Sequence, residues 1–152
     1  MNKTNPIPAG YHTVTPYLTV RNAPGLIEFL RKVFDAQSVG RHDRPDGTIM
    51  HAEVRIGDSM LMVSEACEQM GAMPSHLYLY VPDADTTYQK AMDAGSQSIM
   101  QPENQFWGDR MGGVRDPWGN LFWIGTHIED VSKEELDRRA AEFAAGMDLQ
   151  NK

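Results

Sequence analysis

Two side chains that could exchange protons or bind a metal ion, His51 and Glu53, stand two positions apart. The run Thr48–Ile56 alternates apolar and polar residues, which predicts a strand, and residues two apart on a strand share one face. Imidazole and carboxylate groups serve as general acids and bases and as metal ligands. The alternative is a structural role, in which His51 and Glu53 are solvated or paired with each other on the strand face. A third such group, His76, opens the predicted strand His76–Val81 and is either a functional group or a plain hydrogen-bonding one.

Aromatic and charged side chains gather in a second stretch, Phe106–Thr126. Arg110 stands close to Trp107 there. A guanidinium can hold a carboxylate or phosphate through two hydrogen bonds and can also stack on an aromatic ring. A surface ion pair with Asp109 or Asp116 would use Arg110 equally well. Both interpretations stay open from the sequence.

The pattern of the same stretch predicts a β-hairpin. Proline and glycine in the segment Asp116–Gly119 predict a turn between the strands Met111–Arg115 and Asn120–Thr126. Trp118, at the turn, is expected to pack or to contact a second subunit. Trp123 is expected to face a pocket.

Composition limits the function classes. The chain has 152 residues and a formal net charge of -7, which disfavours nucleic acid and anionic membrane surfaces as partners. No apolar run reaches the roughly 20 residues of a membrane-spanning helix. The single cysteine, Cys67, excludes an intrachain disulfide, and Met1–Pro6 has no apolar core of a signal peptide. We therefore expect a cytoplasmic protein.

The predicted elements repeat. Each half of the chain is expected to be a strand, a helix and then three strands. In the first half, a strand over Tyr11–Val20 precedes a helix that opens at Ala23–Gly25. In the second half, His76–Val81 precedes a helix that Asp83 caps and that ends near Gly95. The shorter runs Met60–Ser64 and Ser98–Gln101 are further predicted strands.

A separate helix is predicted at the end of the chain. Ser132–Glu135 has the pattern of a capping box, in which the serine hydroxyl and the glutamate carboxylate each bind the other residue's backbone N–H. Apolar residues then recur at helical spacing. This helix and tail, residues 132–152, either dock on their own domain or cover a partner subunit. The apolar residues are Leu136, Ala140, Phe143 and Met147.

These motifs resemble the vicinal oxygen chelate superfamily of glyoxalases, bleomycin resistance proteins and dioxygenases, and within it the PhnB-like branch. The similarity is carried by Thr15–Val20, His51–Glu53 with Ile56–Ser59, Leu79–Asp85, and Trp107–Arg110 leading into the hairpin turn. The resemblance implies an α+β fold of two βαβββ modules, about 11–66 and 75–127, that form a cupped mixed sheet. Residues 1–131 would form a single domain, and homodimers are usual in the superfamily.

The superfamily fold implies helices on the convex side of each cup and a ligand site in the hollow. Strand alternation then separates two sets of side chains. Those expected beneath the helices are Val14, Leu18, Val54, Leu77, Leu79, Phe122 and Ile124. Those expected to line the ligand pocket are Thr15, Tyr17, His51, Glu53, Met62, His76, Tyr78, Trp107, Arg110 and Trp123, with Thr13 beside them.

Metal-dependent members of the superfamily carry four ligands, and the matching positions here hold Thr15, His76, Met62 and Trp123. Only the histidine coordinates a divalent ion well, so we expect no metal and no other cofactor. The alternative is a divalent ion in a rearranged site made of His51, Glu53 and His76.

Two functions follow from this interpretation. The first is a metal-free binding protein that holds a small flat or aromatic molecule. The second is an enzyme, either a glyoxalase-type lyase or isomerase that uses the rearranged metal site or a metal-free enzyme with Glu53 or His76 as general base. The loss of three metal-ligand positions favours the binding protein, and whether the protein is an enzyme stays open.

Overall fold

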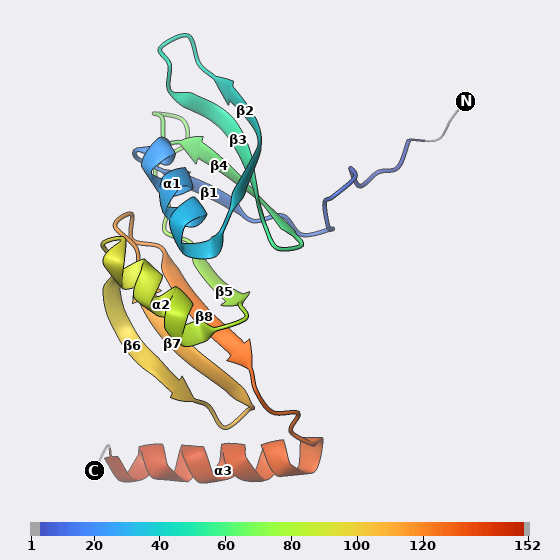
Figure 1. Cartoon of the computed structure of the whole chain (residues 1–152), viewed down its shortest axis with the longest axis vertical. Coiled ribbons are helices and arrows are strands. Elements are labelled where there is room, and N and C mark those ends of the chain that lie inside the picture. Colours follow the sequence, from blue (N-terminus) through green and yellow to red (C-terminus); the bar gives the residue numbers. More distant parts are fainter. Residues whose placement is uncertain (1–3, 151–152) are drawn as a thin grey trace. The chain divides into compact units, whose positions relative to one another are not determined.

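The computed structural model describes residues 4–150 and divides into two compact units. The first unit runs to Ser75 and includes Asp116–Asn120, and the second contains His76–Arg115 and the chain from Leu121 onward. Both repeat one order of elements (Figure 1). The first has β1 (Tyr17–Val20), α1 (Ala23–Phe34), β2 (Gln37–Asp43), β3 (Ile49–Ile56) and β4 (Ser59–Glu65); the second has β5 (His76–Tyr80), α2 (Ala84–Asp93), β6 (Gln97–Asn104), β7 (Asp109–Arg115), β8 (Leu121–His127) and the terminal α3 (Lys133–Gln150).

The two sheets share one topology. The strand orders are β1-β4-β3-β2 and β5-β8-β7-β6. In each sheet the first strand pairs in parallel with the last, and the other pairs are antiparallel. The predicted α+β fold of two βαβββ modules and a C-terminal helix is therefore confirmed. The prediction that residues 1–131 act as a single domain stays a prediction.

Helix α1 covers one face of the first sheet because its apolar residues recur every three or four positions (Figure 1). Leu26, Leu30 and Val33 on this helix are buried, as are Leu18 and Val54 on the strands. The side chain of Asn22 caps the helix by accepting a hydrogen bond from the backbone N–H of Gly25 at 3.2 Å. The predicted core of this module is confirmed at Leu18 and Val54.

Helix α2 covers the second sheet in the same way. Asp83 is its N-cap, as predicted, and its carboxylate accepts a hydrogen bond from the backbone N–H of Thr86 at 3.0 Å. Gly95 follows the helix with a φ of 97°, a conformation that glycine adopts without strain. Phe122 and Ile124 of β8 are completely buried, in agreement with the prediction. Leu77 and Leu79 are half-buried.

Three local predictions were wrong. The strand predicted from Tyr11 begins only at Tyr17, and Val14 is 80% exposed instead of facing a helix. Pro16 has no backbone N–H to donate to a sheet, which explains why pairing starts after it. The alternation in Thr48–Ile56 predicts Met50 on the buried face with Val54, but in β3 Ile49 is buried and Met50 is exposed, because the register with β2 shifts at this end of the strand.

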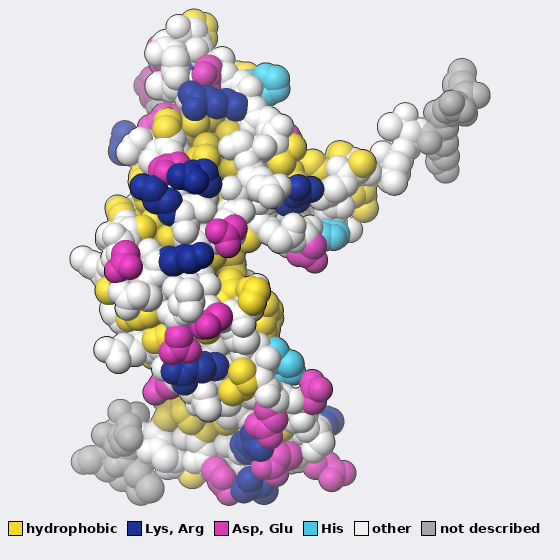
Figure 2. Space-filling model, in the orientation of Figure 1, with side chains coloured by type: hydrophobic (Ala, Val, Ile, Leu, Met, Phe, Trp, Pro, Cys, Tyr) yellow, Lys and Arg dark blue, Asp and Glu magenta, His cyan; other side chains and the backbone are white. Residues whose placement is uncertain are grey.

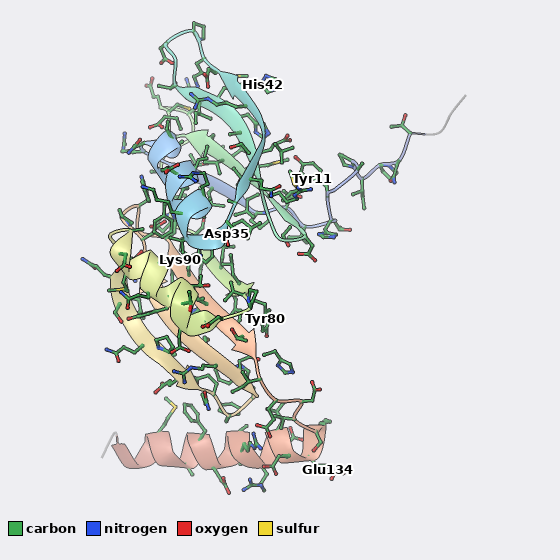
Figure 3. The ribbon with its side chains drawn as sticks, in the orientation of Figure 1. Tyr11, Asp35, His42, Tyr80, Lys90 and Glu134 are labelled. Carbon is green, nitrogen blue, oxygen red and sulfur yellow. The ribbon has the colours of Figure 1, made fainter. Side chains whose placement is uncertain are left out.

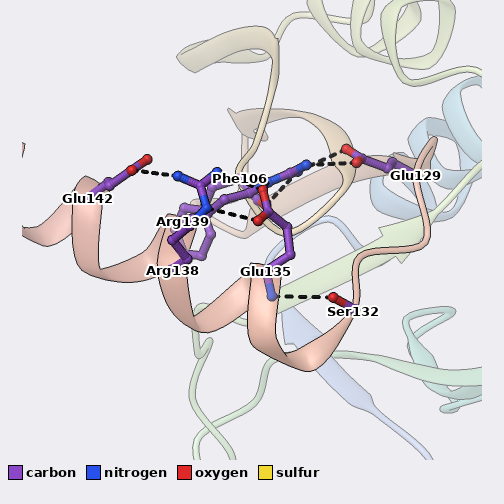
Figure 4. Close-up of polar contacts among 7 residues, drawn as sticks. All are labelled: Phe106, Glu129, Ser132, Glu135, Arg138, Arg139 and Glu142. Atoms are coloured by element: carbon purple, nitrogen blue, oxygen red, sulfur yellow. Dashed lines mark hydrogen bonds and ion pairs between the residues drawn. The ribbon is translucent and has the colours of Figure 1, made fainter.

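Helix α3 packs against its own unit. The Ser132 hydroxyl accepts a hydrogen bond from the backbone N–H of Glu135 at 3.3 Å, as one half of the predicted capping box requires. The Glu135 carboxylate instead binds Arg138 and Arg139 of the next turn (Figure 4). Arg139 also pairs with Glu129, with atoms 2.8 Å apart. Helix α3 is thus held at its first two turns.

The rest of α3 makes a looser contact. The ring of Phe143 lies 5.2 Å from that of Phe106, but Phe143 and Met147 are both about half exposed. Acidic and basic side chains lie side by side over the start of the helix (Figure 2). Of the two arrangements expected for this helix, the contacts of Arg139 and Phe143 correspond to docking on its own domain, and positions 151–152 of the predicted tail lie outside the described residues. None of the helices within residues 4–150 has the length and hydropathy of a membrane span.

Candidate functional site

The face of the second sheet that points away from α2 carries three of the predicted pocket residues, His76, Tyr78 and Trp123. Gly112 marks the covered face, because a Cβ there would lie 3.1 Å from Tyr88 of the helix. Strand alternation and the pairing register therefore place the neighbouring positions on the open face. These are His76, Tyr78 and Tyr80 on β5, Trp123, Gly125 and His127 on β8, and Asp109 and Gly113 on β7.

Two glycines let aromatic rings lie against this face. A Cβ on Gly113 would collide with the six-membered ring of Trp123, and a Cβ on Gly125 would collide with the phenol of Tyr78. The glycines on β7 and β8 thus leave space that the rings fill. We call the surface formed by His76, Tyr78, Tyr80 and Trp123 the aromatic wall.

Hydrogen bonds hold the rings of the aromatic wall in place. The indole N–H of Trp123 donates to Nε2 of His76 at 2.6 Å. The Tyr78 and Tyr80 hydroxyls both donate to Oδ2 of Asp109, at 2.8 and 3.0 Å. Since each ring is fixed both by contact and by a hydrogen bond, the wall is preorganised for binding.

Asp109 is the centre of this network. It is 1% exposed, and its Oδ2 atom also accepts a hydrogen bond from the indole N–H of Trp107 at 2.9 Å. Its other oxygen lies 2.9 Å from Nδ1 of His127, whose Nε2 lies 2.8 Å from Asp130. A buried carboxylate needs several donors to offset the loss of water, and four surround this one.

The network shifts the pKa values of its members. Burial works to raise the pKa of Asp109, but its hydrogen bonds outweigh burial and hold the pKa below its ordinary value. Burial first, and then the bond to Asp109, raise the pKa of Tyr78. The bond to Asp109 also raises the pKa of Tyr80. Two carboxylates raise the pKa of His127. The phenols therefore stay protonated, and the carboxylate charged, near neutral pH.

The aromatic wall is open to solvent. Tyr78 is 39% exposed and Tyr80 is 67% exposed, and their rings lie 5.0 Å apart with planes inclined by 48°. Figure 3 labels Tyr80 on β5. Exposed apolar surface of this kind, fixed by buried polar groups, is typical of ligand sites.

The first unit carries a second group of predicted residues. Tyr17 on β1 and Met62 on β4 are direct neighbours in the sheet, as are Met62 and Glu53 on β3. The Tyr17 hydroxyl lies 3.1 Å from Nδ1 of His51, and Nε2 of that ring lies 3.5 Å from Oε1 of Glu53. The structure therefore brings Tyr17, His51, Glu53 and Met62 together on one face.

Tyr11, which precedes β1, also contacts this group (Figure 3). Its hydroxyl donates a hydrogen bond to Oε1 of Glu53. This bond, more than burial, raises the pKa of Tyr11 to about 12. The same bond is the main reason why the pKa of Glu53 lies below its ordinary value. Glu53 is consequently a charged carboxylate at neutral pH.

Arg110 lies on the opposite face of its sheet from the one predicted to line the hollow. Arg110 is on the α2 side of β7, where its Nη2 atom lies 2.7 Å from Oδ1 of Asp85. It borders an open depression of about 400 Å³ on that side. Thr15 precedes β1 and is half-buried. Trp107 supports the aromatic wall through Asp109. The depression is lined by Asp85, Tyr88, Gln89, Gln101, Pro102 and Arg110.

Comparison with known proteins assigns the family. A model of the Glyoxalase/Bleomycin resistance protein/Dioxygenase superfamily matches residues 11–124. The chain belongs to this superfamily. A relative from Mycobacterium bovis, described as uncharacterised, is 34% identical over 134 residues, which is 81% of this chain and 88% of that protein. An uncharacterised Mycobacterium tuberculosis protein is equally similar, with 79% of its length covered.

Several solved structures share the fold of this chain. TioX from Micromonospora sp. ML1 has a TM-score of 0.60 at 22% identity, over 76% of this chain and 99% of that one. A glyoxalase/bleomycin resistance protein/dioxygenase family enzyme from Burkholderia phytofirmans has a TM-score of 0.61 at 19% identity, over 74% and 95%. The fosfomycin resistance protein FosX from Mesorhizobium loti has a TM-score of 0.58 at 17% identity, over 82% and 95%. At such identities the likeness concerns the fold alone.

The four positions that match the superfamily's metal ligands form a poor donor set. Nε2 of His76 already accepts the Trp123 hydrogen bond, and an indole offers no lone pair to a metal. Met62 offers a thioether, which suits soft ions only. Among the side chains that the structure describes, those of residues 4–147, no three from His, Cys, Asp or Glu are placed to hold a metal ion. The residues present therefore do not fit the superfamily's divalent ion.

Sequence reasoning missed the role of two residues in this site. Asp109 was considered only as a partner of Arg110, and His127 was not considered. A signal existed in both strands. Asp109 stands two and four positions from Met111 and Gly113, and His127 stands four positions from Trp123 on β8, so the residues of each set share one face of the sheet. Gly113 and Gly125 in these strands were a further signal, since a glycine in a strand marks a place where another group approaches closely.

Proposed function

We propose that the protein binds a small flat or aromatic molecule on the aromatic wall. The observation that supports this most strongly is the seating of the Trp123 and Tyr78 rings on Gly113 and Gly125. Rings fixed in this way lose little further freedom when a ligand stacks on them. An aromatic pair contributes about 0.5–1.5 kcal/mol beyond the area that it buries.

Binding in this proposal needs no metal ion. Its support is the donor set of Thr15, Met62, His76 and Trp123, in which only the histidine is an ordinary ligand for a borderline ion. A glyoxalase-type lyase or isomerase with a rearranged site would need a third donor beside His51 and Glu53. Among the described residues of the first unit, no His, Cys, Asp or Glu completes such a group.

The oligomeric state, the branch of the superfamily and the cellular location form part of the same proposal. A homodimer and membership of the PhnB-like branch are supported by the sequence resemblance, and one fold neighbour is titled a PhnB protein from Bacillus cereus at 16% identity. A cytoplasmic location is supported by the single cysteine. Equilibrium sedimentation that finds only monomer would remove the dimer from the proposal.

The test of binding compares two ligands of similar size. 2-Naphthol is flat, and its fully saturated analogue, decahydro-2-naphthol, has a similar outline without aromatic faces. Calorimetric titration should show that 2-naphthol binds and that the saturated analogue binds at least about tenfold more weakly, because stacking is lost. Trp123→Ala should abolish the preference, and Trp118→Ala is the matched control. Equal affinity for both compounds would reject the proposal.

A further inference from the structure

The group of side chains on the first sheet has a connectivity that the binding function does not use. The Tyr17 hydroxyl faces Nδ1 of His51 at 3.1 Å, and the opposite ring nitrogen faces the Glu53 carboxylate at 3.5 Å. A phenol has one proton to donate, and a carboxylate only accepts. All three side chains have suitable partners when the Tyr17 hydroxyl donates to Nδ1 of His51 and Nε2 of His51 donates to Glu53.

Glu53 is held in position from two sides. The Tyr11 hydroxyl binds its Oε1 atom. On the neighbouring strand, a Cβ at Gly40 would lie 3.1 Å from Oε2, so a larger residue there would press on the carboxylate. Glu53 can therefore fix the tautomer and the orientation of the His51 ring, as a carboxylate does for the histidine of a catalytic triad.

Tyr17 is the most exposed of these three side chains. This residue is 48% exposed, and the side chains of His51 and Glu53 are each 28% exposed. Solvent or a small molecule on this face therefore has access to the Tyr17 side chain. The arrangement thus has a carboxylate behind an imidazole, and a phenol in front that can give up one proton as it receives another.

We propose that Tyr17, His51 and Glu53 form a proton relay that removes a proton from a weakly acidic C–H group of a ligand. The ligand's proton moves to the Tyr17 oxygen while the phenolic proton moves to Nδ1 of His51. The Glu53 carboxylate stabilises the resulting imidazolium. The electron pair of the broken C–H bond stays with the ligand, and His51 later returns its proton to the product or to water.

The relay lies in the first unit and the aromatic wall in the second, and the test of the relay needs no natural ligand. 5-Nitrobenzisoxazole is a flat molecule with one acidic C–H group. Removal of that proton forms a nitrile as the ring N–O bond breaks and the electrons move to oxygen, which gives a coloured 2-cyano-4-nitrophenolate. We expect the native protein to open this ring faster than buffer that holds equal free imidazole.

Substitutions test each member of the relay. Tyr17→Phe and His51→Ala should lower the rate by about 10²-fold, the usual contribution of general acid–base catalysis. Glu53→Gln should lower it by about tenfold, because the amide still accepts a hydrogen bond but carries no charge. His42→Ala is the matched control, since His42 on β2 (Figure 3) pairs directly with His51 in the sheet but makes neither the contact between Tyr17 and His51 nor that between His51 and Glu53. This variant should keep the native rate.

A structural readout accompanies the rates. Long-range ¹H–¹⁵N spectra of the native protein, recorded where the His51 ring carries a single proton, should show that proton on Nε2, and Tyr17→Phe should shift the Nδ1 resonance. Far-ultraviolet circular dichroism should show all variants folded, because these side chains are partly exposed. A proton on Nδ1, a native rate no higher than the buffer, or native rates in Tyr17→Phe and His51→Ala would each overturn the relay.

Discussion

The indole N–H of Trp123 and Nε2 of His76 are joined by a hydrogen bond of 2.6 Å between neighbouring strands. The bond fixes the indole plane over Gly113 and uses the lone pair with which the histidine would coordinate a metal. One contact therefore connects the two main features of the proposed function, a flat binding surface and independence of metal.

His76→Ala should leave the fold intact and weaken the binding of 2-naphthol. The side chain is exposed, so its loss changes stability little. Loss of the hydrogen bond frees the indole. A loss of about 0.5–1.5 kcal/mol in binding free energy corresponds to an affinity that is roughly twofold to twelvefold weaker. Calorimetry measures the affinity and thermal melting the stability. His12→Ala is a matched exposed control. A His76→Ala variant that unfolds would show instead that the histidine is a core residue.

Asp109→Asn should destabilise the second unit. An amide at this position turns one acceptor oxygen into an N–H donor that faces the donors of Tyr78, Tyr80 and Trp107, if it replaces Oδ2. We expect a loss of about 2–4 kcal/mol in urea-induced unfolding, because charged hydrogen bonds in a buried site are lost. Asp130→Asn, at an exposed partner of His127, should change the unfolding free energy by no more than about 0.5 kcal/mol. Equal effects of the two substitutions would contradict this account of Asp109.

The pair formed by Asp109 and His127 should make stability depend on pH in two directions. The pKa of Asp109 lies below its ordinary value of 3.8, so its contribution is present above that value and is lost as pH falls through the folded-state pKa. The pKa of His127 lies above its ordinary value of 6.5, so its contribution is complete below 6.5 and is lost as pH rises through the folded-state pKa.

The measurement subtracts the unfolding free energy of His127→Gln from that of the native protein across pH. The difference should be greatest near about pH 5 and should shrink toward about pH 9, where the histidine is neutral in both states. A difference that grows with rising pH would show that His127 is not stabilised in its charged form.

Much of the fold could be predicted from the sequence, because apolar and polar residues alternate clearly along a strand when one face of its sheet is buried. The run Thr48–Ile56 predicted β3 to within one residue. Strand β2, by contrast, received no residue range. It lies at a sheet edge, and nearly all its residues are exposed, so burial imposes no alternation on it.

The candidate site was predictable only in part. Alternation placed Tyr78 and Trp123 on one face, and the structure shows both there. The burial of Asp109 could not be predicted, because its partners come from strands far apart in the sequence. Arg110 is one position from Asp109, and that single step puts it on the opposite face, beside Asp85.

Removal of metal should not affect ligand binding. The purified untagged protein should carry no divalent ion above background in elemental mass spectrometry, before or after equimolar nickel, zinc or manganese is offered. Chelation should leave the 2-naphthol affinity unchanged, because the proposed surface is aromatic. One tightly held ion per chain that is lost in His51→Ala or Glu53→Ala would instead support the rearranged metal site.

The most direct test observes the tryptophan side chains while a ligand binds. The indole N–H resonances of Trp107, Trp118 and Trp123 can be assigned by substitution. Trp118 packs edge-to-face on Phe29 at 5.9 Å and serves as an internal control. We predict that 2-naphthol shifts the Trp123 resonance in a saturable way and leaves that of Trp118 unchanged. Saturable shifts at Trp118 with none at Trp123, or no shifts at all, would contradict binding on the aromatic wall.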